Sequence, residues 1–235
     1  MAPPLRVDDI QAITFDCYGT LIDWEGGAKQ TLGALLKEKA AAPQRGALPA
    51  ELLDAFFQAW ERAQRACIEQ RYAPYREIAA EAFAEVAQAQ NLPLGREEAC
   101  LFAASIAAWK PFPEVPTALA ALKRRVRLGI ISNIDDDILR ASVAQLGVEF
   151  DLLVTAEQAR AYKPSPLPFQ RALARLELPA ARIAHAAFGF EYDIVTASRL
   201  GFRTILVRRT RRHFPGRPVP DLIVADLAAL AAAFE

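Results

Sequence analysis

The 235-residue chain has few of the residues that thiol chemistry and cysteine–histidine metal sites require, and it has no excess of either charge. Its three cysteines, Cys17, Cys67 and Cys100, fit no zinc-binding spacing, and we expect free thiols in a reducing cytosol. Two histidines leave little scope for a histidine-activated thiol. The 28 basic and 28 acidic residues cancel, which argues against a nucleic-acid or anionic-membrane partner.

No apolar run in the sequence is long enough to cross a bilayer, so we expect a cytoplasmic protein with no membrane partner. The basic run Arg208, Arg209, Arg211 and Arg212 lacks interleaved aromatic residues, and we interpret it as a solvated loop. Hydrophobic residues make up 53% of the chain, which is enough for a substantial core. The composition therefore indicates a folded globular protein.

The most informative segment is residues 15–23, where an apolar run ends in a carboxylate. Residues 10–15 predict a buried strand that ends at Asp16, and Gly19 breaks the pattern soon afterwards. Ligands of α/β proteins bind at the carboxyl ends of the strands, so Asp16 lies at a candidate site. Cys17 is adjacent, but strand alternation turns it away from Asp16, and we interpret it as a structural residue.

The rest of the chain predicts two kinds of organisation. Residues 24–110 have helical spacing of apolar positions and predict an all-helical block. Beyond it we predict helices over 116–125, 135–146, 166–176, 192–200 and 227–234, and strands over 127–131, 151–155, 183–188, 203–207 and 221–224. Such alternation is typical of right-handed βαβ units. We therefore predict an α/β fold: a doubly wound, Rossmann-like parallel sheet from residues 1–23 and 111–235, with the helical block 24–110 inserted after the first strand.

Polar side chains lie at or soon after the ends of four predicted strands. They are Asp16 with Thr20, Ser132 with Asn133, Lys163, and Glu191 with Asp193. Taken singly, they have simpler explanations: helix capping, a solvated lysine, or an acid that favours its helix dipole. Because the carboxyl ends of parallel strands share one edge of a sheet, we expect them to converge.

With these four motifs the chain resembles the haloacid dehalogenase (HAD) superfamily, whose motifs are Asp-x-x-x-Thr, a strand-end Ser or Thr, a Lys and a terminal acid. The resemblance covers essentially the whole chain, and the helical block corresponds to that family's cap domain. It implies that Asp16 is the catalytic nucleophile and that Lys163 steadies its charge and that of the intermediate. It also implies that Ser132 and Thr20 orient Asp16 and that Asp193 lies at the same site.

The residue two positions after the nucleophile separates the reaction classes of this superfamily. Phosphatases carry a second Asp there, which protonates the leaving alcohol, whereas this chain has Tyr18. A phenol of pKa about 10 is a poor acid for that role, but a departing halide needs no acid. The motif resembles the L-2-haloacid dehalogenase (type II) branch. This resemblance implies an (S)-2-haloacid dehalogenase of short 2-haloalkanoic acids that works through an aspartyl-ester intermediate and without a cofactor.

A small carboxylic acid substrate needs hydrogen-bond donors and a shaped pocket. We expect the backbone N–H groups of the Tyr18–Gly19–Thr20 turn, with Ser132 and Asn133, to hold its carboxylate. The resemblance adds an arginine from the helical block. The predicted substrate-binding residues are Tyr18, Gly19, Asn133, Phe190 and Arg62, with Arg65 and Arg71 as the other candidate arginines.

The fourth motif departs from the dehalogenase pattern. Relatives carry a serine and an asparagine before the last acid, whereas residues 188–193 read Phe-Gly-Phe-Glu-Tyr-Asp, and Phe169 stands where a tyrosine is common. We hypothesise that these aromatic residues narrow and dry the site. His185, which precedes this motif in a buried strand, is expected to be structural.

Three alternatives stay open at this stage. The first two motifs are also similar to azetidine-2-carboxylate hydrolases, which open a strained ring by the same chemistry but carry His-Asp where this chain has Tyr192-Asp193. A Mg²⁺-dependent phosphatase would hold its ion with Asp16, the carbonyl of Tyr18, and Asp193 or Glu191. The third alternative is a binding protein without catalysis. A homodimer is common among similar proteins.

Overall fold

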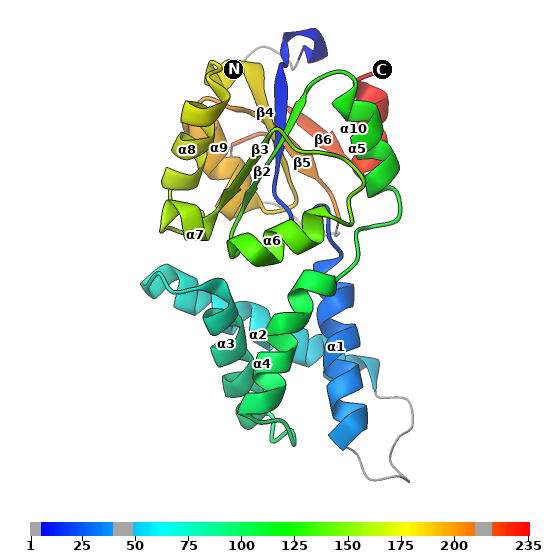
Figure 1. The fold of residues 1–235 in the computed structure, drawn as a ribbon, viewed down its shortest axis with the longest axis vertical. Coiled ribbons are helices and arrows are strands. Elements are labelled where there is room, and N and C mark those ends of the chain that lie inside the picture. Colours follow the sequence, from blue (N-terminus) through cyan, green and yellow to red (C-terminus); the bar gives the residue numbers. More distant parts are fainter. Residues whose placement is uncertain (1–5, 40–48, 210–217) are drawn as a thin grey trace. The chain divides into compact units, whose positions relative to one another are not determined.

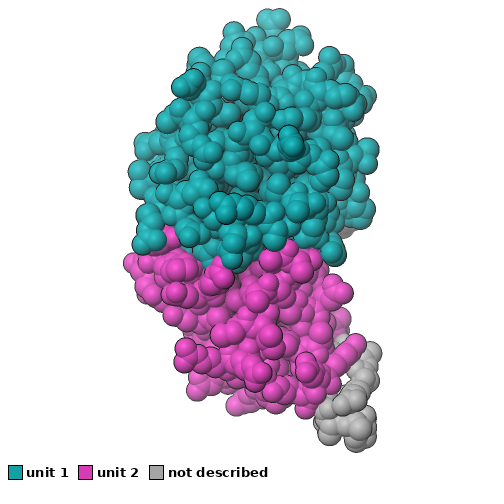
Figure 2. Space-filling view, in the orientation of Figure 1, with its two compact units in different colours: residues 1–23, 110–235 teal, residues 24–109 magenta. Residues whose placement is uncertain are grey.

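The computed structural model describes residues 6–39, 49–209 and 218–235. The chain divides into two compact units, Met1–Asp23 with Lys110–Glu235, and Trp24–Trp109 (Figure 2). The first division coincides with the predicted boundary after residue 23, and the second lies one residue before the predicted boundary after residue 110.

In its described residues, the first unit contains a six-stranded parallel sheet of strand order β3-β2-β1-β4-β5-β6 (Figure 1). The strands are β1 (Ala12–Phe15), β2 (Arg127–Ser132), β3 (Leu152–Thr155), β4 (Ile183–Ala187), β5 (Arg203–Val207) and β6 (Leu222–Val224). Every neighbouring pair is parallel. The predicted doubly wound α/β fold is confirmed, with β1 at the centre of the sheet, where the strand order reverses.

Helices cover both faces of this sheet. They are α5 (Val115–Lys123), α6 (Asp136–Val143), α7 (Ala156–Ala159), α8 (Leu167–Leu176), α9 (Val195–Arg199) and α10 (Leu227–Ala233). Figure 1 shows α8 and α9 on one face and α5 with α10 on the other. One core cluster joins Ala12 of β1 to Phe169 of α8 and Ala197 of α9. Because both faces are covered, all four residues of β1 are buried.

One predicted helix differs from the structure in a way that matters for the site. The segment 192–200 was expected to be a single helix, but it begins with a π-helical turn, Phe190–Ile194, and continues as the short helix α9. The wider turn carries Asp193, and π-turns are common at functional sites.

The second unit is helical throughout its described residues, in line with the predicted all-helical block. Its helices are α1 (Trp24–Lys39), α2 (Ala50–Gln70), α3 (Tyr75–Ala89) and α4 (Arg96–Ser105), followed by a short turn, Ile106–Ala108. Aromatic side chains hold them together: the ring centroids of Trp24 and Trp60 lie 4.9 Å apart, and those of Phe83 and Phe102 lie 4.6 Å apart. No described helix is long and apolar enough to span a membrane.

Candidate active site

Asp16 lies immediately after β1 and is 8% exposed. A tight turn follows, in which the N–H groups of Leu21 and Ile22 donate to the Cys17 carbonyl, and Gly19 has a φ of +86° that disfavours any other residue. The turn returns the Thr20 hydroxyl to Asp16, where its Oγ1 donates to Asp16 Oδ2 over 2.8 Å. This hydrogen bond restrains the rotation of the carboxylate, and the orienting role of Thr20 stays a prediction.

The Lys163 ammonium joins the remaining elements of the site. The residue is 1% exposed, and its Nζ donates to Asp16 Oδ1 (2.9 Å), to Asp193 Oδ1 (2.6 Å) and to the Ile131 carbonyl (2.8 Å). These contacts use all three of its protons. The side chain of Asn133 holds the backbone of Lys163 with two hydrogen bonds. Its Oδ1 accepts from the Lys163 N–H (2.7 Å), and its Nδ2 donates to the Lys163 carbonyl (3.0 Å).

The electrostatics of this cluster follow from burial and charge pairing. Burial, reinforced by the charge of Asp193, raises the pKa of Asp16 in spite of the attraction of Lys163. Burial also acts on Asp193, but Lys163 and the hydrogen bond from His185 outweigh it and hold the pKa of Asp193 below its ordinary value. Burial disfavours a charged Lys163, and the two carboxylates outweigh it and raise its pKa. The cluster therefore contains an ammonium between two carboxylates, of which Asp16 is the more basic.

Two glycines make room for the fourth motif. A Cβ on Gly189 would lie 2.4 Å from Asp193 Oδ2, so this position must lack a side chain for the carboxylate to fold back over the backbone. A Cβ on Gly19 would lie 2.8 Å from the ring of Phe188, which therefore packs closely against the turn that follows Asp16. The Phe188 N–H donates to Thr20 Oγ1 over 3.0 Å, which ties the two motifs together.

A family model described as a haloacid dehalogenase-like hydrolase matches residues 10–187. The chain belongs to the haloacid dehalogenase-like hydrolase family. Haloacetate dehalogenase H-2 of Moraxella sp. (strain B) is 30% identical over 68% of this chain and 69% of its own. (S)-2-haloacid dehalogenase of Pseudomonas sp. (strain YL) is 28% identical over 97% of this chain and 96% of its own. The predicted superfamily and the predicted enzyme class, a hydrolase, are confirmed.

Solved structures of the family have the same fold. L-2-haloacid dehalogenase of Xanthobacter autotrophicus, in a structure with chloropropionic acid covalently bound, has a TM-score of 0.79 at 23% identity, covering 95% of this chain and 97% of that one. Another L-2-haloacid dehalogenase structure has a TM-score of 0.81 at 24% identity, covering 96% and 98% of the two chains. At these identities the likeness is one of fold.

Tyr18 was predicted to bind substrate, but its side chain has a partner within the protein. The phenol is hydrogen-bonded to Ser142 Oγ on α6 over 2.8 Å, and burial raises its pKa well above the ordinary value. The side chain therefore stays a neutral phenol, anchored to a helix.

The turn donors differ from the prediction as well. The N–H of Gly19 donates to the Ile22 carbonyl (2.8 Å), and the N–H of Thr20 donates to the Cys17 carbonyl (3.3 Å). The expectation that both N–H groups are available to a substrate carboxylate is therefore corrected, because the turn itself uses them. Ser132 is buried at the end of β2, which pairs with β1 in the sheet, and its role stays a prediction.

Phe190 was predicted to bind substrate, but its side chain is buried in a small apolar cluster with Ala187, Ile194 and Leu206. Phe190 therefore packs the π-helical turn against the sheet, and we assign it to the core. Glu191, the alternative acid of this motif, is exposed. The three candidate arginines, Arg62, Arg65 and Arg71, are exposed residues of the second unit, and their role stays a prediction.

Sequence reasoning missed two residues that support the site. Arg209 was interpreted as part of a solvated loop, but its Nε and Nη2 both donate to the Thr20 carbonyl (3.2 and 2.8 Å), and its guanidinium stacks 3.8 Å from the centre of the Phe112 ring. Arg211 and Arg212 lie outside the described residues. His185 is the second supporting residue that sequence reasoning missed, and its Nε2 lies 3.0 Å from Asp193 Oδ1. A histidine within a buried strand of small residues was the signal available for it.

The phosphatase alternative assigns Asp16 and Asp193 to a metal ion, but Oδ1 of each carboxylate is already paired with the Lys163 ammonium. Across the described ranges, no cluster of three or more His, Cys, Asp or Glu side chains could hold a metal.

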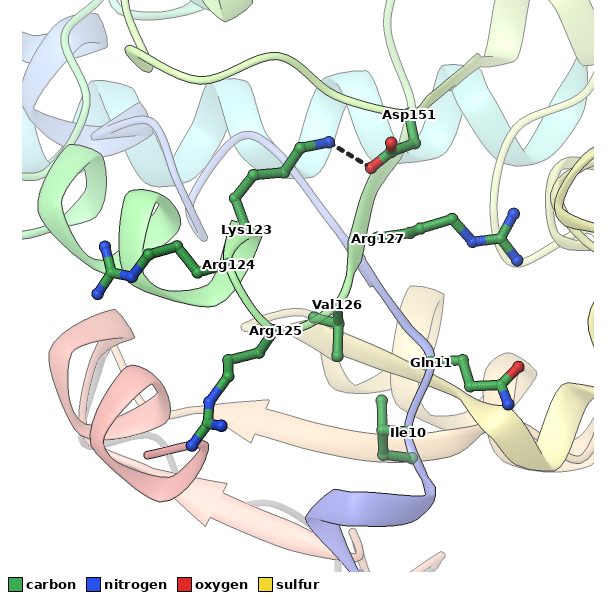
Figure 3. Close-up of a pocket in the computed structure, with 8 residues that line it drawn as sticks. All are labelled: Ile10, Gln11, Lys123, Arg124, Arg125, Val126, Arg127 and Asp151. Carbon is green, nitrogen blue, oxygen red and sulfur yellow. Dashed lines mark hydrogen bonds and ion pairs between the residues drawn. The ribbon is translucent and has the colours of Figure 1, made fainter.

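A surface depression of about 420 Å³ lies at the opposite end of the sheet (Figure 3). Its lining comes from the amino ends of β1 and β2 and from the end of α5. The basic side chains there diverge: Lys123 turns to Asp151 (2.6 Å), while Arg124 and Arg127 point away from each other. They therefore present no common binding point, and the depression is separate from the site around Asp16.

Proposed function

We propose that the protein is an (S)-2-haloacid dehalogenase that acts on short 2-haloalkanoic acids, with Asp16 as its nucleophile. The observation that carries this proposal is the Lys163 ammonium, held between Asp16 and Asp193 in a site without a second acid at position 18. Two relatives that are dehalogenases by name, from Moraxella and Pseudomonas, support the substrate class.

The first step forms a bond from a carboxylate oxygen of Asp16 to C2 of the substrate, while the C2–halogen bond breaks and the halide leaves with the electron pair. Carboxylates are weak nucleophiles in water, and the burial that raises the pKa of Asp16 also makes its ionised form more reactive. Halide departs as an anion, so the neutral, hydrogen-bonded phenol of Tyr18 is no handicap.

The second step is hydrolysis of the resulting aspartyl ester. Water attacks the carbonyl carbon of Asp16, the hydroxy acid leaves, and Asp16 returns as a carboxylate with release of one proton. Lys163 Nζ, already bonded to Asp16 Oδ1, can stabilise the negative charge that develops on the carbonyl oxygen. Asp193 keeps the ammonium at that position, and Ser132 lies at the same strand end.

The surroundings of Asp16 favour small substrates. The Phe188 ring packs against the nucleophile turn where relatives carry a small polar residue, which reduces the room beside Asp16. We therefore propose that haloacetate and 2-halopropionate are better substrates than longer acids. We further propose that residues 24–110 act as a cap that excludes water, with Arg62 as its carboxylate ligand. We expect Arg62→Lys to raise KM more than it lowers kcat.

The experiment is a panel assay of halide release from monochloroacetate and from L- and D-2-chloropropionate, with Asp16→Asn as the inactive control. A parallel single turnover in ¹⁸O water should place the label in the peptide that contains Asp16. Label found only in the product would contradict the ester route.

Two further compounds test the alternative reactions. L-azetidine-2-carboxylate tests ring opening, in which the leaving amine must gain a proton that Tyr18 is badly placed to supply. An aryl phosphate with Mg²⁺ tests phosphatase activity. Turnover of either compound without halide release from any haloacid would overturn the proposed function.

A further inference from the structure

His185 is a buried polar residue with two partners. It lies in the middle of β4 among Ala184, Ala186 and Ala187, and its side chain is 0% exposed. Its Nε2 is 3.0 Å from Asp193 Oδ1, and its Nδ1 is 2.9 Å from the Thr14 hydroxyl. Thr14 and His185 are register partners in β1 and β4, so the sheet itself sets this contact.

Both sides of the imidazole are constrained. The ring of Phe169 packs edge-on against it, with centroids 5.0 Å apart and an interplanar angle of 78°. Because an ionised Asp193 only accepts hydrogen bonds, the proton of the contact belongs to His185 Nε2. On the other side of the ring, Nδ1 lies 2.9 Å from the Thr14 hydroxyl, which also donates to the Ala184 carbonyl over 3.4 Å. The surroundings therefore fix the ring orientation and place an Nε2–H on Asp193.

The contact reaches the nucleophile through a shared oxygen. Asp193 Oδ1 accepts from His185 Nε2 and from Lys163 Nζ, and Lys163 Nζ donates in turn to Asp16 Oδ1. The other oxygen of Asp193 folds against Gly189, where a Cβ would lie only 2.4 Å away. This series of hydrogen bonds, His185–Asp193–Lys163–Asp16, thus links the centre of the sheet to the reacting carboxylate.

We propose that His185 is a positioning residue, which fixes the Asp193 carboxylate so that the Lys163 ammonium stays on Asp16. This inference rests on the proposed function for its catalytic consequence. His185 contacts neither Asp16 nor any reacting atom, so it acts through Asp193. Without its Nε2–H, Asp193 Oδ1 keeps only the hydrogen bond from Lys163, so the carboxylate can turn with the ammonium and no longer directs it to the nucleophile.

The matched variants are His185→Gln and His185→Leu. Glutamine places an amide N–H near the position of Nε2 and keeps a donor for Asp193, whereas leucine fills similar space without one. We expect His185→Leu to lower kcat by about tenfold or more, since the contact is a hydrogen bond to a charged group, with no rise in KM. We expect His185→Gln to keep most of the activity.

A purely structural histidine would give a different result. Both variants would then lose thermal stability, while the folded fraction of each kept the kcat of the parent. A kcat of His185→Leu within about twofold of the parent, measured per folded molecule, would overturn the proposal.

A second measurement needs no substrate and stands apart from the proposed function. The chain has two histidines, so ¹⁵N-labelled imidazole resonances are few, and the His185→Gln variant identifies those of His185. We expect a slowly exchanging Nε2–H that moves when Asp193 is changed to Asn. A neutral His185 with its proton on Nδ1 would overturn the positioning role. If no haloacid is turned over, the dehalogenase proposal fails, and the resonance still decides the contact.

Discussion

Lys163 is the residue whose removal should change this protein most. Its Nζ lies 2.9 Å from Asp16 Oδ1 and 2.6 Å from Asp193 Oδ1, and its side chain is 2% exposed. Lys163→Met keeps the apolar stem but leaves two carboxylates buried, close together and without their cation. Breaking a buried ion pair by removing one partner costs about 3–5 kcal/mol, so we expect a loss of about that size in the free energy of unfolding at neutral pH.

The loss should shrink as the pH falls. In the variant, burial and mutual repulsion place the pKa values of both carboxyl groups above those of the unfolded chain, so the folded state gains stability as the pH drops through the raised values. In the parent protein the pKa of Asp193 is held below its ordinary value, so its contribution is present at neutral pH and is lost as the pH falls. Both effects bring parent and variant closer together in acid.

The assay is urea unfolding followed by circular dichroism at about pH 5 and about pH 8. Lys123→Met is the matched control, because Lys123 also pairs with an aspartate, Asp151, at 2.6 Å, but both side chains are 33% exposed. Such a surface pair contributes no more than about 1 kcal/mol, with little dependence on pH over this range. An equal loss for the two variants, or a loss for Lys163→Met that does not change with pH, would refute the reasoning.

Three further predictions concern Asp16, the proposed nucleophile, and its neighbours. Tyr18→Phe should lose about 1 kcal/mol of stability with the Ser142 hydrogen bond yet keep halide release within a few-fold of the parent, and abolished release would show that the phenol takes part in the chemistry. Gly189→Ala should lower halide release by about tenfold or more, because its Cβ meets Asp193 Oδ2 at 2.4 Å, and unchanged kinetics would mean that the carboxylate can move without cost. In a pH–rate profile of halide release, the acid limb should lie above the ordinary pKa of an aspartate, because Asp16 reacts only when ionised and its pKa is raised; a limb below that value would contradict the assigned direction.

The sequence alone was enough to predict the α/β fold, the helical insertion and the convergence of the polar side chains around Asp16. The reason is local: apolar runs of strand length alternate with helical patterns, and a parallel sheet brings the carboxyl end of every strand to one edge. Asp16, Thr20, Lys163 and Asp193 each lie at or shortly after such an end, so their convergence follows from topology without knowledge of any contact. The absence of a carboxylate at position 18 was equally visible in the sequence.

What the sequence could not supply are contacts that depend on which strand neighbours which, and on the packing of individual side chains. Thr14 and His185 are 171 residues apart and meet because β1 pairs with β4 in one register. Arg209 reaches the Thr20 carbonyl from 189 residues away, although its local surroundings resemble a solvated basic run. Phe190 is drawn into an apolar cluster because the π-helical turn points it toward β5. Long-range register and packing, which no local pattern encodes, decided how Asp16 is held.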